Sequence, residues 1–151
     1  MTAAGCGLAR HRPADLEVNQ MLDIGMRHSA QTVVTEENTA AKAGSGSLMV
    51  FGTPYMVALM ENAALNLLAA VLPEGKGSVG TAMNITHSSP TPLGMTVRAE
   101  AEVTQISANG KIIDFKVSAY DETGLIGEGT HQRAVIDNVR FMAKANGKRN
   151  P

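Results

Sequence analysis

The sequence contains one cysteine, no tryptophan and few aromatic residues. The single cysteine, Cys6, excludes a disulfide framework within the chain and a cysteine-rich metal site, and it favours a reducing, cytoplasmic location. Aromatic residues make up only 3% and the formal net charge is -1, so we expect no nucleic-acid partner. No run of about 18 apolar residues is present, so we expect no membrane span.

The length of 151 residues predicts one globular domain with a modest core. Residues 1–20 lack the apolar stretch of a signal peptide and are expected to form a flexible extension. A natural start at Met21 is the alternative. We expect the folded domain to cover residues 21–144 and the polar tail 145–151 to be disordered.

Residues 54–72 have the composition of one long helix, rich in Ala, Leu and Met. Thr53 is the expected N-cap, followed by Pro54, and Pro73 ends the helix. Apart from Tyr55, the polar side chains inside it are Glu61, Asn62 and Asn66. A helix that is apolar nearly all round should be surrounded by other structure.

Other segments alternate apolar and polar residues, which is typical of half-buried strands. An Asn-Gly turn at residues 107–110 joins two of them. Gly127 and Gly129 interrupt the last strand and indicate a bulge or a close backbone approach. The predicted strands cover residues 26–34, 80–87, 95–103, 113–119 and 125–136.

This order of elements predicts an α+β fold: one antiparallel sheet of about five strands wrapped around a long central helix. That is the hotdog architecture. One small sheet leaves part of such an apolar helix uncovered, so we expect a homodimer or a higher homo-oligomer.

Glu61 is the first candidate for chemistry, because burying a carboxylate is costly unless it is paired or functional. Burial without a cation raises a carboxyl pKa toward neutrality, which suits a general base. Alternatively, Glu61 faces a solvent gap or pairs with a basic residue.

His87 ends a strand, where site residues often lie, although an ordinary histidine fits there too. His131, in the segment GTHQR, is a secondary candidate. Thr53 lies eight residues from Glu61, about 12 Å along one helix, so the two cannot hydrogen-bond on an unbroken helix. The sequence has no metal-ligand spacing or cofactor motif, so we expect neither metal nor cofactor.

The segments FGTPYMVALMENAA, EGKGSVGTAMNITHSSPTPLGMTVRAEAEV and GEGTHQRAVI, with the later VRFMAK, resemble the fluoroacetyl-CoA thioesterase-like family of hotdog-fold thioesterases. The resemblance covers roughly residues 21–144 and implies a dimer that hydrolyses short acyl-CoA thioesters. It further implies catalytic roles for Thr53, Glu61 and His87. The backbone of Gly80 would line the acyl site, and Arg133 would bind substrate.

One segment departs from the family. Phenylalanines that form a lid in the fluoroacetyl enzyme are absent from residues 43–48, AGSGSL, so we expect a broader or different acyl group. The predicted function is hydrolysis of a short or small acyl-CoA to free acid and CoA, with Glu61 as base or nucleophile. The alternative is a non-catalytic acyl-CoA-binding hotdog module. A hotdog hydratase would need an Asp/His motif that is not seen.

Overall fold

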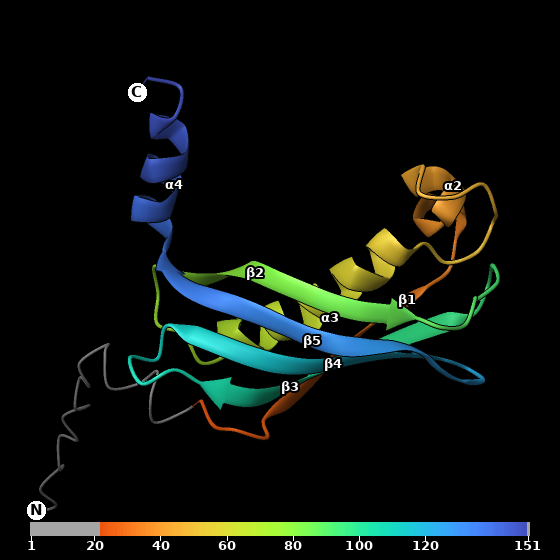
Figure 1. The fold of residues 1–151 in the computed structure, drawn as a ribbon, viewed down its shortest axis with the longest axis horizontal. Helices are drawn as coiled ribbons and strands as arrows, with labels where there is room; N and C mark the ends of the chain where they lie inside the picture. Colours follow the sequence, from red (N-terminus) through yellow and green to blue (C-terminus); the bar gives the residue numbers. More distant parts are fainter. Residues whose placement is uncertain (1–21, 151) are drawn as a thin grey trace, which may run out of the picture.

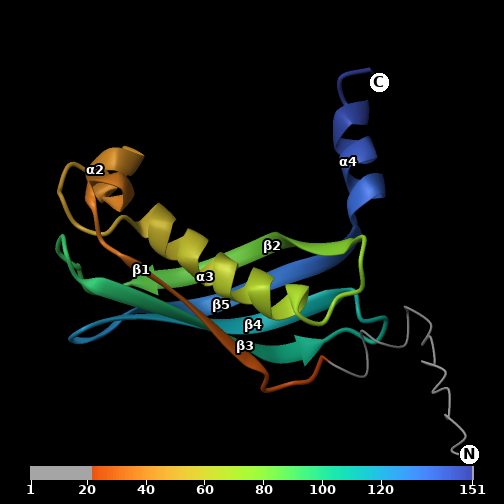
Figure 2. The ribbon, with the colours of Figure 1, turned by 180° about the vertical axis from the view of Figure 1, so that it is seen from behind.

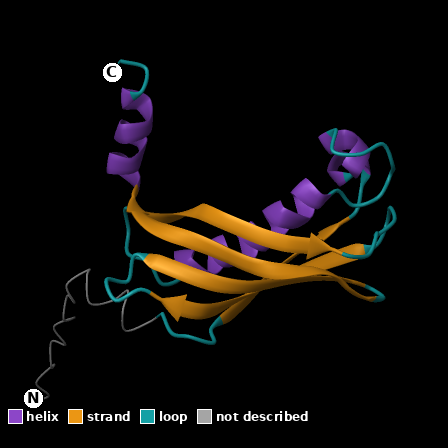
Figure 3. Ribbon diagram, in the orientation of Figure 1, coloured by secondary structure: helices purple, strands orange, loops and turns teal. Residues whose placement is uncertain are grey.

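A computed structural model describes residues 22–150, which form a five-stranded antiparallel sheet with one long helix against its concave face (Figures 1 and 2). The predicted extension 1–20 lies outside the described residues. Strands contribute more residues to the domain than helices do (Figure 3). The strand order across the sheet is β1-β3-β4-β5-β2. In chain order the elements are β1 (Arg27–Val33), η1 (Glu36–Asn38), α2 (Ala40–Ala43), α3 (Thr53–Ala69), β2 (Lys76–His87), β3 (Thr96–Ile106), β4 (Ile112–Asp121), β5 (Gly124–Asp137) and α4 (Asn138–Gly147).

The long predicted helix is α3, and its predicted N-cap is wrong. Gly52 is the N-cap residue, without a side-chain capping bond, and Thr53 is the first helical residue. Gly52 packs so closely on Thr39 that a Cβ would lie 3.0 Å from the Thr39 backbone. The Thr53 hydroxyl is turned instead toward His87. It is therefore available for a role other than capping.

All five predicted strands are present, and the predicted alternation of β3 and β4 is confirmed. Their inner faces are fully buried, through Val97, Ala99, Ala101 and Val103 on β3 and Ile113, Phe115, Val117 and Ala119 on β4. Strand β2 begins at Lys76, four residues before the predicted start at Gly80.

The prediction for Gly127 and Gly129 is confirmed in both of its forms. The register between β4 and β5 shifts beside Gly127, since Tyr120 pairs with Leu125 and Ala119 with Gly127. A Cβ on Gly127 would lie 2.8 Å from the Met56 sulfur. Gly127 therefore lets α3 approach β5, and Gly129 lets the backbone of β2 approach β5, at points where a side chain would collide.

Helix α3 packs on β1, β2, β3 and β4 through one face, formed by Met56, Met60, Ala63, Ala64, Leu67 and Leu68. Its other side is exposed in the single chain, including Asn62, Leu65 and Asn66. The sheet therefore covers one face of a helix that is apolar nearly all round and leaves the other side uncovered within one chain, as expected for a single small sheet.

Helix α4 is not predicted by the sequence analysis. It stands away from the end of the sheet where β5 ends and β2 begins (Figure 1). The Asp137 carboxylate accepts a hydrogen bond from the Arg140 backbone N–H at 3.0 Å and caps the helix. None of its residues is buried. Its end at Gly147 lies within the tail expected from residue 145, and the domain limit at Lys144 stays a prediction.

We expect Gly129→Ala to destabilise the fold by about 1–3 kcal/mol, the usual cost of overpacking a tight site. Its new methyl group would overlap the Asn84 carbonyl oxygen and lie 2.7 Å from the Ile85 Cα. The matched control is Gly147→Ala in α4, where nothing lies within 4 Å. Urea denaturation measures both variants, and equal midpoints would contradict the close approach.

Candidate active site

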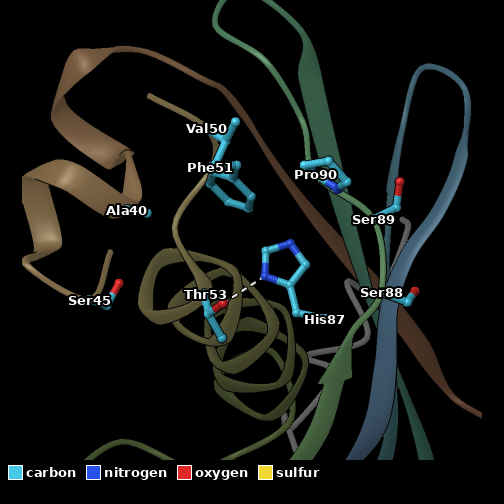
Figure 4. Close-up of a pocket in the computed structure, with 9 residues that line it drawn as sticks. All are labelled: Ala40, Ser45, Val50, Phe51, Thr53, His87, Ser88, Ser89 and Pro90. Carbon is cyan, nitrogen blue, oxygen red and sulfur yellow. Dashed lines mark hydrogen bonds between the residues drawn. The ribbon is translucent and has the colours of Figure 1, made fainter. Parts of the chain in front are cut away.

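Thr53 and His87 form a hydrogen-bonded pair, with 2.7 Å between Thr53 Oγ1 and His87 Nδ1 (Figure 4). Thr53 comes from the first turn of α3 and His87 from the last residue of β2. The predicted site residues Thr53 and His87 are thus brought together by the helix start meeting the strand end.

A pocket of about 290 Å³ lies beside the Thr53–His87 pair (Figure 4). Most of its walls are small or hydroxyl-bearing side chains, and Phe51 is its one aromatic wall apart from the histidine ring. The lining residues are Ala40, Ser45, Val50, Phe51, Thr53, His87, Ser88, Ser89 and Pro90. The pocket suits a small group rather than a long chain.

His87 is poised to bind a further group. Its Nε2 atom is buried and has no hydrogen-bond partner among the described residues. Burial lowers the pKa of His87, an effect that the nearby Ser89 backbone partly offsets. The ring is therefore neutral at pH 7, with one nitrogen on Thr53 and the other directed at no described partner.

A second group of residues surrounds Glu61 in the middle of α3. Its Oε2 atom lies 3.8 Å from Arg133 Nη1 on β5. A Cβ on Gly80 would lie 2.9 Å from the same carboxylate oxygen, so the glycine leaves room for it. The structure thus brings together Glu61, Gly80 and Arg133, three of the residues to which the family resemblance assigns site roles.

Three hydrogen bonds, none of them to Glu61, fix the Arg133 guanidinium. Nε donates to the Ser78 hydroxyl at 2.8 Å, Nη2 donates to the Ser78 carbonyl oxygen at 2.9 Å, and Nη1 lies 3.1 Å from His131 Nε2. Burial lowers the pKa of Arg133, while the Glu61 carboxylate opposes that change. The guanidinium is a buried cation with three of its five N–H donors directed at fixed partners.

His131 is the neutral neighbour that such a cation requires. Its Nδ1 lies 2.8 Å from the Ala82 carbonyl oxygen and therefore carries the proton, which leaves Nε2 to accept from Arg133. Burial lowers the pKa of His131, and the Arg133 charge acts in the same direction against the raising effects of the Ala82 carbonyl and Glu61. The ring stacks on Phe115 at 6.0 Å between centroids.

The expected environment of Glu61 needs a correction. The sequence predicts a buried position without a cation. In the structure the Glu61 side chain is 42% exposed, and it faces the Arg133 side chain, which is 6% exposed. The alternative reading, a carboxylate near solvent and paired with a basic residue, describes this chain. Helix α3 presents Glu61 at the border between its packed face and its uncovered side.

The two groups are separate within one chain. Thr53 and Glu61 are eight residues apart on an unbroken helix, which corresponds to about 12 Å of rise. Ser78 was not predicted as a site residue, because nothing in the sequence marks a serine near the start of a strand as the partner of a buried arginine. His131 was only a secondary candidate, because its partners become visible only when β2 and β5 pair.

Residues 22–150 contain no set of three His, Cys, Asp or Glu side chains arranged to hold a metal ion. In the same part of the chain, no helix is both long and apolar enough to cross a membrane.

Comparisons with known proteins identify the family to which this chain belongs. The family model for fluoroacetyl-CoA-specific thioesterases matches residues 34–139. The fluoroacetyl-CoA thioesterase of Streptantibioticus cattleyicolor is 46% identical over 99 residues, which are 66% of this chain and 70% of the relative. A solved structure of a point mutant of the fluoroacetyl-CoA thioesterase FlK in complex with fluoroacetate has a TM-score of 0.78 at 35% identity, covering 86% of this chain and 100% of that one.

A thioesterase superfamily member from Thermus thermophilus has a TM-score of 0.77 at 27% identity, covering 92% of this chain and 96% of that one. The chain therefore belongs to the fluoroacetyl-CoA-specific thioesterase family and has the hotdog fold. It is a thioester hydrolase that acts on acyl-CoA.

The lowered pKa values of His87, which is half-buried, and His131, which is buried, predict a pH dependence of stability. The unfolded chain titrates its histidines near pH 6.5 and binds more protons than the folded chain below that pH. The free energy of unfolding should therefore fall as the pH drops below about 6.5.

We expect His131→Gln to flatten this decrease, because it removes one of the two histidines with a lowered pKa. His28→Gln, on an exposed position of β1, is the control and should leave the slope unchanged. Urea denaturation at several pH values between about 5 and 8 measures the slope. An identical slope in wild type and His131→Gln would contradict the neutral, buried ring.

Proposed function

We propose that this chain hydrolyses a short or small acyl-CoA thioester to the free acid and CoA, with Glu61, His87 and Thr53 as the catalytic group. The observation that carries the proposal is the Glu61 carboxylate held over Gly80, 3.8 Å from the buried Arg133. A carboxylate with one fixed neighbour and an open side can reach water and a bound carbonyl group. A purely structural ion pair needs no adjacent glycine.

In the proposed reaction, Glu61 acts as general base. It takes a proton from water, and the oxygen attacks the thioester carbonyl carbon. The tetrahedral intermediate then breaks its carbon–sulfur bond, and the proton held by Glu61 passes to the CoA thiolate. Direct attack by Glu61, which gives a mixed anhydride that water hydrolyses, is the alternative route through the same residues.

His87 and Thr53 orient the thioester in this proposal. With Nδ1 accepting from the Thr53 hydroxyl, Nε2 carries the proton and donates a hydrogen bond into the site. A neutral imidazole stabilises developing charge on oxygen or sulfur without transferring its proton. The partial positive charge at the N-terminus of α3 favours negative charge there.

The acyl group is proposed to be small and not restricted to fluoroacetyl. The pocket beside His87 measures about 290 Å³, and no aromatic side chain comes from residues 43–48. Fluoroacetyl-CoA is the substrate named for the relatives. The lid that their phenylalanines form has no counterpart in this segment, so acetyl-CoA and other short esters should be accepted.

A homodimer is part of the proposal, because one chain holds the two groups about 12 Å apart. Strand β2 is an edge of the sheet and carries Gly80 near its middle and His87 at its end. Antiparallel pairing of β2 with its copy would bring Gly80 toward His87 of the partner subunit. It would also cover the exposed side of α3. The cytoplasmic location expected from the sequence remains part of this proposal.

Replacement of Glu61 tests the catalytic role. We expect Glu61→Gln to lower kcat for acyl-CoA hydrolysis by roughly 10²–10⁴-fold, the usual contribution of a general base. The matched control is Glu122→Gln, the same loss of charge on an exposed residue of the turn between β4 and β5, which should keep wild-type activity. Thiol release from acetyl-, propionyl-, butyryl- and fluoroacetyl-CoA measures both. Near-full activity of Glu61→Gln would reject the mechanism, and CoA binding without thiol release in wild type would favour the binding module.

Complementation tests the shared site. We expect Glu61→Gln and His87→Ala to be inactive alone and to regain about a quarter of wild-type activity when co-expressed. Random pairing makes half of the dimers mixed, and each mixed dimer has one site with both native residues. Differently tagged chains allow the mixed dimer to be isolated. An inactive mixed dimer would show that each site lies within one protomer.

A further inference from the structure

An open basic cavity of about 330 Å³ lies between α4 and the end of the sheet, away from both groups of the candidate site. Its walls come from the start of β2, the end of β5, the turn before β4 and one face of α4. The lining residues are Lys76, Lys111, Val135, Ile136, Asp137, Arg140, Phe141 and Lys144. We propose that this cavity binds the phosphates of the 3′-phospho-ADP end of CoA, an inference that rests on the proposed function.

The charge of the cavity is not balanced by the fold. It holds four cations, Lys76, Lys111, Arg140 and Lys144, and one carboxylate, that of Asp137. No ion pair joins any of the four to a carboxylate of the described residues. The whole chain has a net charge of -1, so this clustering is local. Like charges gathered around a cavity repel one another, and a bound polyanion relieves that repulsion.

The Asp137 carboxylate offsets only one of the four positive charges of the cavity, because four cations less one carboxylate leave a formal charge of +3. It accepts the Arg140 backbone N–H and caps α4. That hydrogen bond lowers the pKa of Asp137, and the charges of Lys76 and Arg140 add to the effect. The carboxylate is thus engaged in the helix start, while the ammonium and guanidinium groups remain free to bind oxygens.

The shape of the cavity fits a nucleotide phosphate. Arg140 and Lys144 are four residues apart and share one face of α4. Lys76 and Lys111 approach from the sheet side of the cavity. Phe141 is partly exposed beside them and offers an aromatic face on which a purine could stack. Arg and Lys donors together with an aromatic face are the groups that bind a phosphorylated adenosine.

The distance to the candidate site matches the length of CoA. Lys76 precedes Gly80 by four residues on β2, and Asp137 follows Arg133 by four on β5. Four residues of strand span roughly 13 Å. The pantetheine arm contains two amide groups, and its chain from sulfur to pyrophosphate is about as long as four extended residues, roughly 14 Å. One extended CoA ester can therefore reach from Gly80 to the basic cavity.

The test reverses two charges on α4. We expect the double variant Arg140→Glu/Lys144→Glu to raise the KM for acetyl-CoA by roughly tenfold or more, with kcat unchanged, since each lost charge–phosphate contact weakens binding several-fold. Acetyl-pantetheine lacks the nucleotide, and its hydrolysis should be the same in both proteins. The matched control, Lys148→Glu/Arg149→Glu, makes the same charge change beyond the cavity and should leave both substrates unaffected.

Three results would overturn the inference: an unchanged KM for acetyl-CoA, an equal loss with acetyl-pantetheine, or an equal loss in the control variant. Calorimetric titration with CoA and with pantetheine separates this inference from the proposed function, because it needs no hydrolysis. Weaker CoA binding in the double variant without activity in wild type would support the cavity and reject the proposed function. Normal hydrolysis by the double variant with an unaffected KM would support the proposed function and reject the cavity as a phosphate site.

Discussion

The close contact between α3 and the sheet is the constraint on which the rest of this structure depends. Where the helix crosses β2 and β5, the sheet presents glycines, and a Cβ on Gly80 or Gly127 would collide with Glu61 or Met56. Without side chains at these two positions, the helix comes near enough to bury its apolar face and to place a carboxylate on the strand backbone. The same contact therefore forms the core and positions the candidate site, so a change that loosens one also moves the other.

A buried guanidinium is expensive unless its donors are satisfied, and the surroundings of Arg133 meet that requirement in an unusual way. Ser78 takes two of its N–H groups, and a neutral His131 accepts another. The Glu61 carboxylate is left at 3.8 Å, beyond hydrogen-bond distance. Arg133 thus holds the carboxylate by charge without occupying its oxygens in a tight fork. In the proposed reaction this leaves Glu61 free to bind water.

The sequence predicted the architecture well because periodicity is a local property. Alternation along β3 and β4 and the apolar run of α3 follow from neighbouring residues alone. The family resemblance named Thr53, Glu61 and His87 as catalytic residues, but it did not predict which side chains pair. Thr53 contacts His87 and Glu61 faces Arg133 across 34 and 72 positions of sequence, and residues so far apart carry no mutual signal. The N-cap error and the missed Ser78 share one cause, because the contact of Gly52 with Thr39 and that of Ser78 with Arg133 form only in the folded chain. Helix α4 is different, since its cap joins Asp137 to the Arg140 backbone N–H three residues away, a local signal that the sequence analysis overlooked.

Strand β2 connects every part of the proposed site in linear order. His87 stands at its end, Gly80 in its middle and Lys76 at its start. A CoA ester laid along this strand from Gly80 toward Lys76 would place its thioester at the Glu61 carboxylate and its phosphates at the basic cavity, while its acyl group would enter the pocket beside His87 of the partner subunit. Because the strand is an edge, its free side can receive a copy of itself, and the same geometry then brings the end of one β2 to the middle of the other. A shift in the strand pairing would move the acyl pocket of one subunit relative to Glu61 of the other. The distance from Gly80 to the basic cavity would stay the same, because both lie on one chain. In the proposed site, the register of the dimer therefore sets which acyl group fits, while the single chain sets the fit of the CoA portion.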